Sequence, residues 1–333
     1  MSSLIWEART ISGKGTGLVA CVAIAEGTRI LVEEPLLKLP EKLPVSEADG
    51  YITNALKSLP KDQQRQFFSL HNSYSDKNVF RGIFKTNSLP CGPEPFSAVY
   101  PTICLINHDC IPNTHHSWNK NLNAETVHAT RSIAAGEEIT IAYIHPMTTT
   151  EPRRSYLKEH FSFDCFCKLC SCSVIERLLS DARRIELDRL TNAFFAHKTS
   201  EPEEALLNLR KIILLLKEVC DSRKVATERL LICIQEYNGV AQVLESDVYH
   251  DAVKITIIHG DQAQAIVFAE RGYKLRVVCT GEDGSLSNEM KLLMNNPASH
   301  HCFEKSKRWK SAKEAVPRGM NKEDFEKWLW GMK

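Results

Sequence analysis

The chain has 333 residues, and 42 lysines and arginines nearly balance 41 aspartates and glutamates, for a formal net charge of +1. This balance gives no electrostatic surface for direct binding of nucleic acid or an anionic membrane. No apolar run approaches the roughly 20 residues of a membrane helix, and the first residues lack a secretory signal. We therefore expect an intracellular monomer, nuclear, cytoplasmic or both, with a protein or small-molecule partner.

The first part of the chain reads as short strands joined by glycine turns. Residues 4–40 contain β-like runs separated by glycine, and residues 24–30 recur in outline at 133–139, each with a glycine before a β-branched run. Between these segments, residues 45–72 have helical character, with Phe67, Phe68 and Leu70 as candidate core contacts. The sequence therefore predicts a β-rich domain with a helical insertion.

The middle of the chain changes character before a helical second half. Residues 81–113 are rich in proline, which disfavours a long helix or a central strand, so we expect loops and short apolar segments there. After Cys172 helical periodicity dominates, as in residues 203–217 and 226–244. A chain of this length divides more naturally into two modules than one, and the second module is predicted to be α-helical.

A cysteine cluster carries the strongest chemical signal. Cys165, Cys167 and Cys170 place three thiols within six residues, as a tetrahedral zinc site requires. The fourth ligand is not fixed by spacing, because Cys172 lies close in sequence and Cys110 stands in a polar loop far upstream. The alternative is a group of reduced thiols without metal, as in other proteins without a secretory signal.

Three weaker motifs precede the cysteines. Residues 13–17, Gly-Lys-Gly-Thr-Gly, allow a sharp turn and close approach to a ligand, but they form neither a Walker loop nor a dinucleotide fingerprint. Asn107 and His108 follow an apolar segment and suit either a polar ligand or a capped turn with a satisfied histidine. Tyr143 ends an alternating strand over residues 138–143, where a structural tyrosine is the alternative.

Taken in order, these pieces resemble the SET-domain methyltransferase family, in particular its split-SET branch of the SET-and-MYND type and its fungal relatives. The matching segments are residues 13–18, 107–113, 136–143 and the cysteine trio, and the resemblance covers about residues 4–172. It implies an α+β fold with a knot-like crossing near the Asn-His motif. The implied parts are a SET domain over residues 1–164, a zinc-binding post-SET segment over 165–172, and an α-helical C-terminal module over 173–333.

The resemblance also implies an activity and its residues. S-adenosylmethionine would donate a methyl group to an amine, expected to be a lysine of a protein, with histone and non-histone substrates both open. The implied cofactor-binding residues are Lys14, Gly15, Thr16, Asn87, Asn107, His108, Tyr143 and Phe163. Tyr143 is the implied catalytic residue, and Phe161 and Phe163 line the substrate pocket. Cys110 becomes the fourth ligand of a structural zinc ion held with Cys165, Cys167 and Cys170.

Three departures from the family pattern bear on these expectations. Phe161 stands where SET-and-MYND relatives often have a second pocket tyrosine, and Asp109 replaces a serine between His108 and Cys110. Residues 33–100 hold Cys91 and a sparse set of histidines, so we expect no MYND zinc finger. Phe161 favours an alternative, a binding or regulatory protein with weak catalysis. A further alternative is a methyltransferase that acts on a small-molecule amine.

Overall fold

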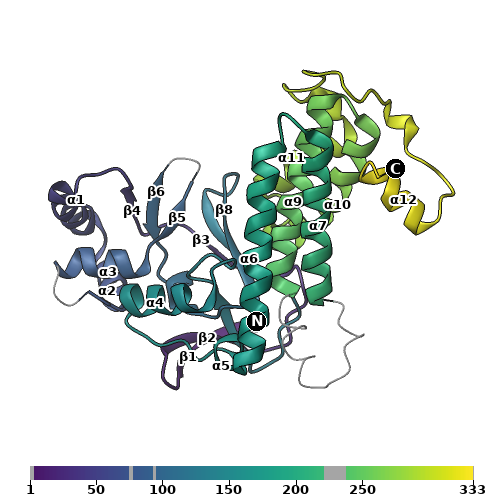
Figure 1. Ribbon diagram of the computed structural model, residues 1–333. Helices are drawn as coiled ribbons and strands as arrows, with labels where there is room; N and C mark the ends of the chain where they lie inside the picture. The colour runs from purple at the N-terminus through teal and green to yellow at the C-terminus, as the bar shows by residue number, and fades with distance from the viewer. Residues whose placement is uncertain (1–3, 75–77, 93–94, 221–237, 333) are drawn as a thin grey trace. The chain divides into compact units, whose positions relative to one another are not determined.

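The computed structural model describes residues 4–74, 78–92, 95–220 and 238–332 (Figure 1). The chain forms two compact units, Met1–Pro146 with Thr150–Ser171 and Met147–Thr149 with Cys172–Lys333. The first is rich in short strands and the second is helical, which confirms the predicted α+β class. The part of the predicted helix at residues 226–237 lies outside the described residues.

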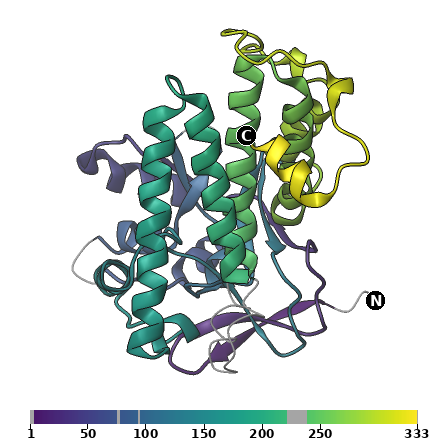
Figure 2. The same ribbon diagram turned by 45° about the vertical axis from the view of Figure 1, so that its right-hand side comes forward.

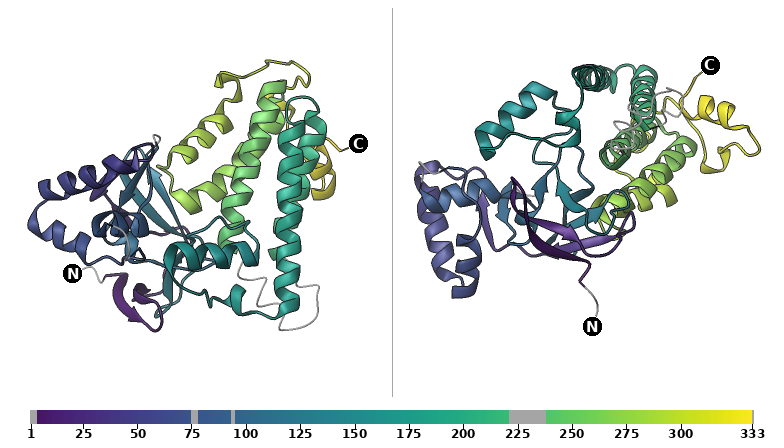
Figure 3. Two further views of the ribbon diagram at one scale, coloured as in Figure 1. Left: turned by 60° about the vertical axis from the view of Figure 1, so that its left-hand side comes forward. Right: turned by 90° about the horizontal axis from the view of Figure 1, so that it is seen from below.

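The sheet that later positions the site is built from four strands of the first unit. Its order is β1 (Trp6–Ile11), β2 (Gly15–Ala20), β10 (Glu138–Ile141) and β7 (Asn107–His108). β1 and β2 form an antiparallel hairpin, seen in purple in both panels of Figure 3, whose turn uses positive φ angles at Gly13 and Gly15. β10 runs antiparallel to β2 and parallel to β7. The two similar segments noted in the sequence meet in an antiparallel bridge between Ile24 and Ile133.

Two further small antiparallel sheets complete the strands of this unit. One has the order β3 (Arg29–Glu33), β9 (Ala124–Ala129) and β8 (Thr114–Asn119), and the other β4 (Leu37–Pro40), β6 (Phe96–Val99) and β5 (Leu89–Cys91). A buried apolar cluster packs residues of the first two sheets together, among them Leu18, Val127 and Ile139. The short strands are therefore held by side-chain burial in a shared core rather than by long ladders.

The helical insertion is longer than the sequence predicts. α1 (Val45–Ser58) and α2 (Lys61–Phe68) lie in the expected region, but α3 (Val79–Asn87) extends into a stretch expected to be irregular. Asn78 caps α3 by accepting from two backbone N–H groups, and Ile83 and Phe84 are buried. Phe67 is fully buried as expected, whereas Phe68 is 46% exposed and was wrongly counted as core.

Three short elements of the first unit matter for the site. The 3-10 turn η1 (Ile103–Leu105) leads into β7, α4 (Thr150–Phe161) precedes the cysteine-rich segment, and α5 (Lys168–Ser171) lies within it. The buried positions of α4 are Thr150, Arg153 and Leu157, spaced three and four residues apart. One face of α4 is therefore buried, and this face includes the cationic side chain of Arg153.

The second unit consists of packed helices: α6 (Val174–His197), α7 (Pro202–Cys220), α9 (Asn238–His259), α10 (Gln262–Thr280), α11 (Ser285–Asn295) and α12 (Lys322–Leu329), with 3-10 turns η3 (Pro297–Ser299) and η4 (Lys313–Ala315). Figure 2 shows the long helices of this unit running side by side, and α6 packs on α7, α7 on α9, and α9 on α10. α6 begins with a capping box between Ser173 and Glu176. In the described residues, no helix is both long enough and apolar enough to span a membrane.

Candidate active site and metal centre

Four cysteines from two distant segments meet in the first unit. Cys110, Cys165, Cys167 and Cys170 are buried, and their sulfur atoms all lie within 4.8 Å of one another. The Cys110 sulfur is 3.8 Å from that of Cys165 and 3.6 Å from that of Cys170. A tetrahedron with metal–sulfur bonds of ~2.3 Å has edges of ~3.8 Å, whereas a disulfide would need ~2.05 Å. The donor set fits a closed, structural zinc site.

The choice between the two candidate fourth ligands follows from the sheet. β7 pairs with β10, and the loop that follows β7 carries Cys110 to the cysteines after α4. Cys172 is partly exposed, and among the described residues it does not join the group of four. Cys170 is held on α5, which is closed by the Ser171 N–H donating to the Cys167 carbonyl over 2.9 Å. Tertiary pairing rather than local spacing thus completes the cluster.

A buried arginine that sequence reasoning missed lies beside these thiols. Arg153 is 1% exposed, and one of its terminal nitrogens is 3.9 Å from the Cys170 sulfur. Arg154, its neighbour on α4, donates to the Cys170 carbonyl over 2.8 Å. Burial disfavours the guanidinium cation, but the thiol groups of Cys110 and Cys170 nevertheless raise the pKa of Arg153. The sequence signal that could have identified Arg153 is its place on the buried face of α4, three residues after Thr150 and four before Leu157.

His108 links the cysteines to the tyrosine strand. Its Nε2 lies 3.2 Å from the Cys110 sulfur, and its Nδ1 accepts the backbone N–H of Tyr143 over 3.0 Å. Because Nδ1 is an acceptor, the neutral ring carries its proton on Nε2 and donates it to sulfur. His108 is 4% exposed and pairs with Ile141 in the parallel ladder between β7 and β10. One imidazole therefore couples the metal centre to the backbone of Tyr143.

An aromatic group surrounds Tyr143. Its ring centroid is 4.8 Å from that of Phe161 and 5.3 Å from that of His108, and Phe163 is 6.1 Å from His108. The Tyr143 hydroxyl donates to the Ile106 carbonyl over 2.7 Å. Burial raises the pKa of Tyr143, so the phenol is protonated at neutral pH. The arrangement is a cluster of aromatic rings with one fixed hydroxyl.

A polar group lies where the turn between β1 and β2 meets the starts of β7 and β10. The Lys14 ammonium is 2.7 Å from one carboxylate oxygen of Glu138, and the Asn107 side-chain amide donates to the other over 2.9 Å. The same amide lies 3.3 Å from the Thr16 carbonyl. Glu138, which sequence reasoning did not single out, therefore binds two predicted residues, Lys14 and Asn107, and Asn107 in turn reaches Thr16. The available signal was the position of Glu138 at the start of the alternating segment 138–143, of which β10 forms residues 138–141.

The glycine motif and Asn87 play different structural parts. Gly15 has a φ of +76° and open space where a side chain would stand, whereas a Cβ on Gly17 would lie 2.6 Å from the Asn107 amide nitrogen. Asn87 ends α3, and its amide nitrogen donates to the carbonyls of His71 and Ile83. Among the described residues, Asn87 has no hydrogen bond to the group around Glu138.

The loop between His108 and Asn113 is held by its own polar side chains. The Asp109 carboxylate accepts the Ile111 N–H over 2.8 Å, and burial raises the pKa of Asp109. Asn113, which is 1% exposed, donates to the Glu138 carbonyl and accepts the Thr140 N–H over 2.9 Å. These contacts fix the loop against β10, so the residues before and after it are placed together.

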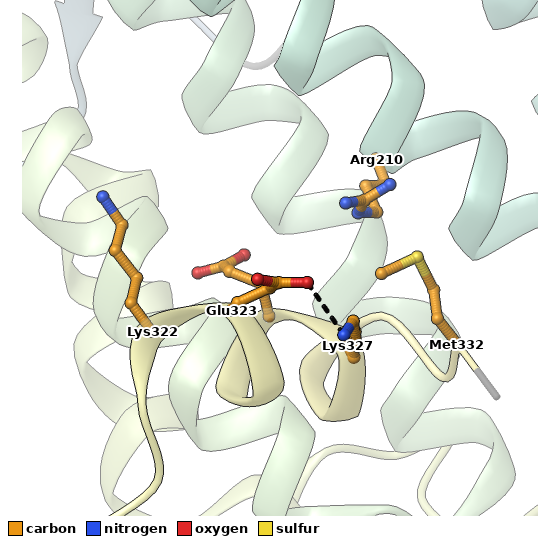
Figure 4. Close-up of a pocket in the computed structure, with 6 residues that line it drawn as sticks. Arg210, Lys322, Glu323, Lys327 and Met332 are labelled. Atoms are coloured by element: carbon orange, nitrogen blue, oxygen red, sulfur yellow. Dashed lines mark ion pairs between the residues drawn. The ribbon is translucent and has the colours of Figure 1, made fainter.

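A pocket in the second unit is separate from these residues. It has a volume of about 410 Å³ and is lined by Arg210, Lys322, Glu323, Glu326, Lys327 and Met332. Figure 4 shows Lys327 directed at Glu323, with a nitrogen–oxygen distance of 2.8 Å. None of the residues predicted for the site lines this pocket. Two of its carboxylates are already paired, Glu323 with Lys327 and Glu326 with Arg271, so we assign no chemistry to it.

Several known proteins are similar to this chain in sequence. Residues 15–144 match the family model described as "SET domain". The chain is 32% identical over 335 residues to histone-lysine N-methyltransferase set5 of Schizosaccharomyces pombe, covering 99% of this chain and 95% of that protein. It is 25% identical over 222 residues to N-lysine methyltransferase SMYD2-B of Danio rerio, covering 63% of this chain and 49% of the relative. The solved SET domain of LSMT, bound to lysine and AdoHcy, aligns with a TM-score of 0.31 and 15% identity, covering 77% and 89% of the two chains.

Proposed function

Because this chain belongs to the SET-domain family, we propose that it transfers a methyl group from S-adenosylmethionine to the side-chain amine of a lysine in a protein. The similarity to a lysine methyltransferase extends along almost the whole chain, so the proposal concerns both compact units rather than the SET domain alone. The observation that carries it is the pairing of β7 with β10, which puts Asn107 and His108 beside the strand that precedes Tyr143 and lets His108 accept the Tyr143 N–H.

The polar group around Glu138 fits the cofactor. The amino-acid end of S-adenosylmethionine carries a carboxylate and an ammonium, so its site needs both a cation and oxygen acceptors. Lys14 and the carbonyl of Thr16 supply these next to the open turn at Gly15, and Asn107 adds an amide. We assign Lys14, Gly15, Thr16, Asn107, His108, Tyr143 and Phe163 to cofactor binding, with Asn87 as a more distant member.

The aromatic group prepares the acceptor amine. Bound S-adenosylmethionine supplies an electrophilic methyl group, and a lysine must be neutral to attack it, although its usual pKa is about 10.4. An apolar wall of Tyr143, Phe161 and Phe163 disfavours the ammonium form and so lowers that pKa. The Tyr143 hydroxyl, fixed by its bond to Ile106, presents its oxygen lone pairs to the amine and to methyl C–H groups. Alignment of the reacting atoms can contribute several kcal/mol.

The four cysteines hold the pocket in shape. We propose that Cys110, Cys165, Cys167 and Cys170 bind a structural zinc ion, since their sulfur separations match a closed tetrahedral site. Cys165 follows Phe163 by two residues, and Cys110 follows His108 by two residues. A zinc ion held there would fix the two chain segments that carry His108 and Phe163.

The acceptor is a protein lysine, with histones as the first candidates because the relative from S. pombe is named for that substrate. We further propose that the protein acts as a monomer in the nucleus, the cytoplasm or both. One observation favours a second candidate, a SET-fold binding protein with weak catalysis. Phe161 lies 4.8 Å from Tyr143 and brings no hydroxyl to the pocket.

Calorimetric titration with S-adenosylmethionine tests the cofactor site. The zinc-loaded wild type should bind one equivalent, and Asn107→Ala should bind much more weakly. Tyr143→Phe is the matched control, because it should bind nearly as well as the wild type while losing turnover. A folded, zinc-loaded wild type that binds no S-adenosylmethionine would leave the non-catalytic binding protein as the better account.

A further inference from the structure

A second cluster of metal-ligating side chains lies in the helical unit. His300, His301 and Cys302 are consecutive, and one potential ligand atom from each lies within 4.8 Å of the others. The two imidazole centroids are 4.4 Å apart, with the ring planes inclined by 32°. Consecutive side chains of an extended segment point to opposite sides. Here the chain turns, with the Phe303 N–H donating to the His300 carbonyl over 2.9 Å, and the three side chains gather.

This turn is anchored to the fold on both sides. η3 precedes it, and Phe303 packs against the core of the helical unit. The Glu304 and Ser306 N–H groups donate to the carbonyls of Ile257 and Ile258 at the end of α9, each over 3.1 Å. The backbone of the cluster is therefore ordered before any ligand binds. A preformed site loses less conformational entropy on binding than a free peptide segment.

The donor atoms select the kind of ion. Two imidazoles and one thiolate are ligands for borderline-soft cations such as Zn²⁺, whereas Mg²⁺ and Ca²⁺ require oxygen ligands. His300 Nδ1 accepts the Cys302 N–H over 3.2 Å, so a cation bound at Nδ1 would replace that hydrogen bond. Both imidazoles bind as neutral rings, and the Cys302 thiol releases its proton to solvent as the sulfur–metal bond forms.

The surroundings supply one anionic group. Glu289 interacts electrostatically with His300, and its carboxylate is 3.2 Å from His250 Nε2. Lys254 acts on His300 in the opposite sense. Since Glu289 is already paired with His250, a water molecule would complete four-coordination.

We propose that His300, His301 and Cys302 form a second Zn²⁺ site that is independent of the four-cysteine centre. The two groups share no residue, and they belong to different compact units of the chain. The site does not depend on the methyltransferase function proposed above, so the failure of one proposal leaves the other standing.

Zinc counting on the full chain tests this site. Each protein is titrated with Zn²⁺ in competition with a chromophoric chelator, and bound zinc is confirmed by elemental analysis. The double variant His301→Ala, Cys302→Ser should bind one zinc ion fewer than the wild type, with the tight zinc unchanged. Cys21→Ser, which removes an exposed thiol elsewhere, is the matched control and should keep the wild-type count.

The reciprocal variant completes the design. Cys167→Ser should lose the tight zinc while the weaker one remains. Equal zinc counts and affinities in the wild type and the double variant would overturn the proposal, as would loss of both ions from a double variant with wild-type circular dichroism. If the double variant does not fold, the single variant His301→Ala provides the test, because replacing an exposed side chain should leave the fold intact. It should weaken binding of the second zinc ion by at least about tenfold.

Discussion

The link through His108 gives the sharpest prediction, because the two ring nitrogens have different partners. In His108→Asn, the amide oxygen stands near the place of Nδ1 and can still accept the Tyr143 N–H. The shorter side chain has no donor at the place of Nε2, so the hydrogen bond to the Cys110 sulfur is lost. The variant therefore removes the hydrogen bond to Cys110 and keeps the one from Tyr143, so the two contributions can be measured separately.

The expected loss follows from the kind of hydrogen bond removed. A hydrogen bond to a charged acceptor contributes about 1.5–3 kcal/mol, and the Cys110 sulfur would be such an acceptor when it holds the proposed zinc ion. Since about 1.4 kcal/mol corresponds to a factor of ten, zinc should bind about 10- to 150-fold more weakly. Loss of a partner to a metal ligand usually costs about 10- to 100-fold, which agrees with this range.

Chelator competition on the full chain measures this change without any cofactor. His108→Gln is the matched control, because its longer amide retains a donor near the place of Nε2 but gives up the acceptor for Tyr143. It should keep near-wild-type zinc affinity and melt at a lower temperature, since a buried N–H loses its partner. If His108→Asn binds zinc as tightly as the wild type, the proposed coupling between the metal centre and Tyr143 is wrong.

Four further predictions test separate parts of the account. Cys167→Ser should release the buried zinc and lower the melting temperature, because metal-binding energy is coupled to folding; metal analysis with thermal unfolding checks this, and an unchanged melting temperature would refute it. Arg153→Met should weaken the same zinc about 10- to 100-fold by removing the buried cation, whereas the exposed Arg9→Met should not. Phe161→Tyr adds a hydroxyl where a methylated amine needs room, so mass spectrometry should find a higher ratio of mono- to dimethylated lysine; an unchanged ratio would contradict this placement. Because burial raises the pKa of Tyr143, its phenol stays protonated in alkaline solution. The initial rate should therefore increase with pH as the substrate lysine loses its proton, and it should show no decrease at any pH up to about 10.

The fold class followed from patterns that depend on neighbours along the chain. Glycine turns before β-branched runs and helical periodicity after Cys172 are local signals, and the α+β prediction drawn from them is confirmed. The same reasoning missed α3, because prolines at 90 and 95 made the whole stretch read as irregular. α3 ends at Asn87, before the first of these prolines, and its Asn78 cap was a local signal that outweighs them.

Less of the site could be predicted from the sequence, because its contacts join segments that are far apart along the chain. Spacing alone could not choose between Cys110 and Cys172, because the choice depends on the pairing of β7 with β10. Glu138 and Arg153 were missed for the same reason. Glu138 on a strand and Arg153 on a helix can be recognised as site residues only once tertiary packing places Lys14 next to the first and the Cys170 sulfur next to the second.

The most direct test of the central claim is methyl transfer itself. Purified, zinc-loaded protein is incubated with core histones and S-adenosylmethionine carrying a tritiated methyl group, and the labelled residues are identified by mass spectrometry. The account predicts label on lysine side chains with the wild type and none with Tyr143→Phe. Absence of transfer to histones and to total soluble cell protein, by a wild type that binds S-adenosylmethionine, would contradict it.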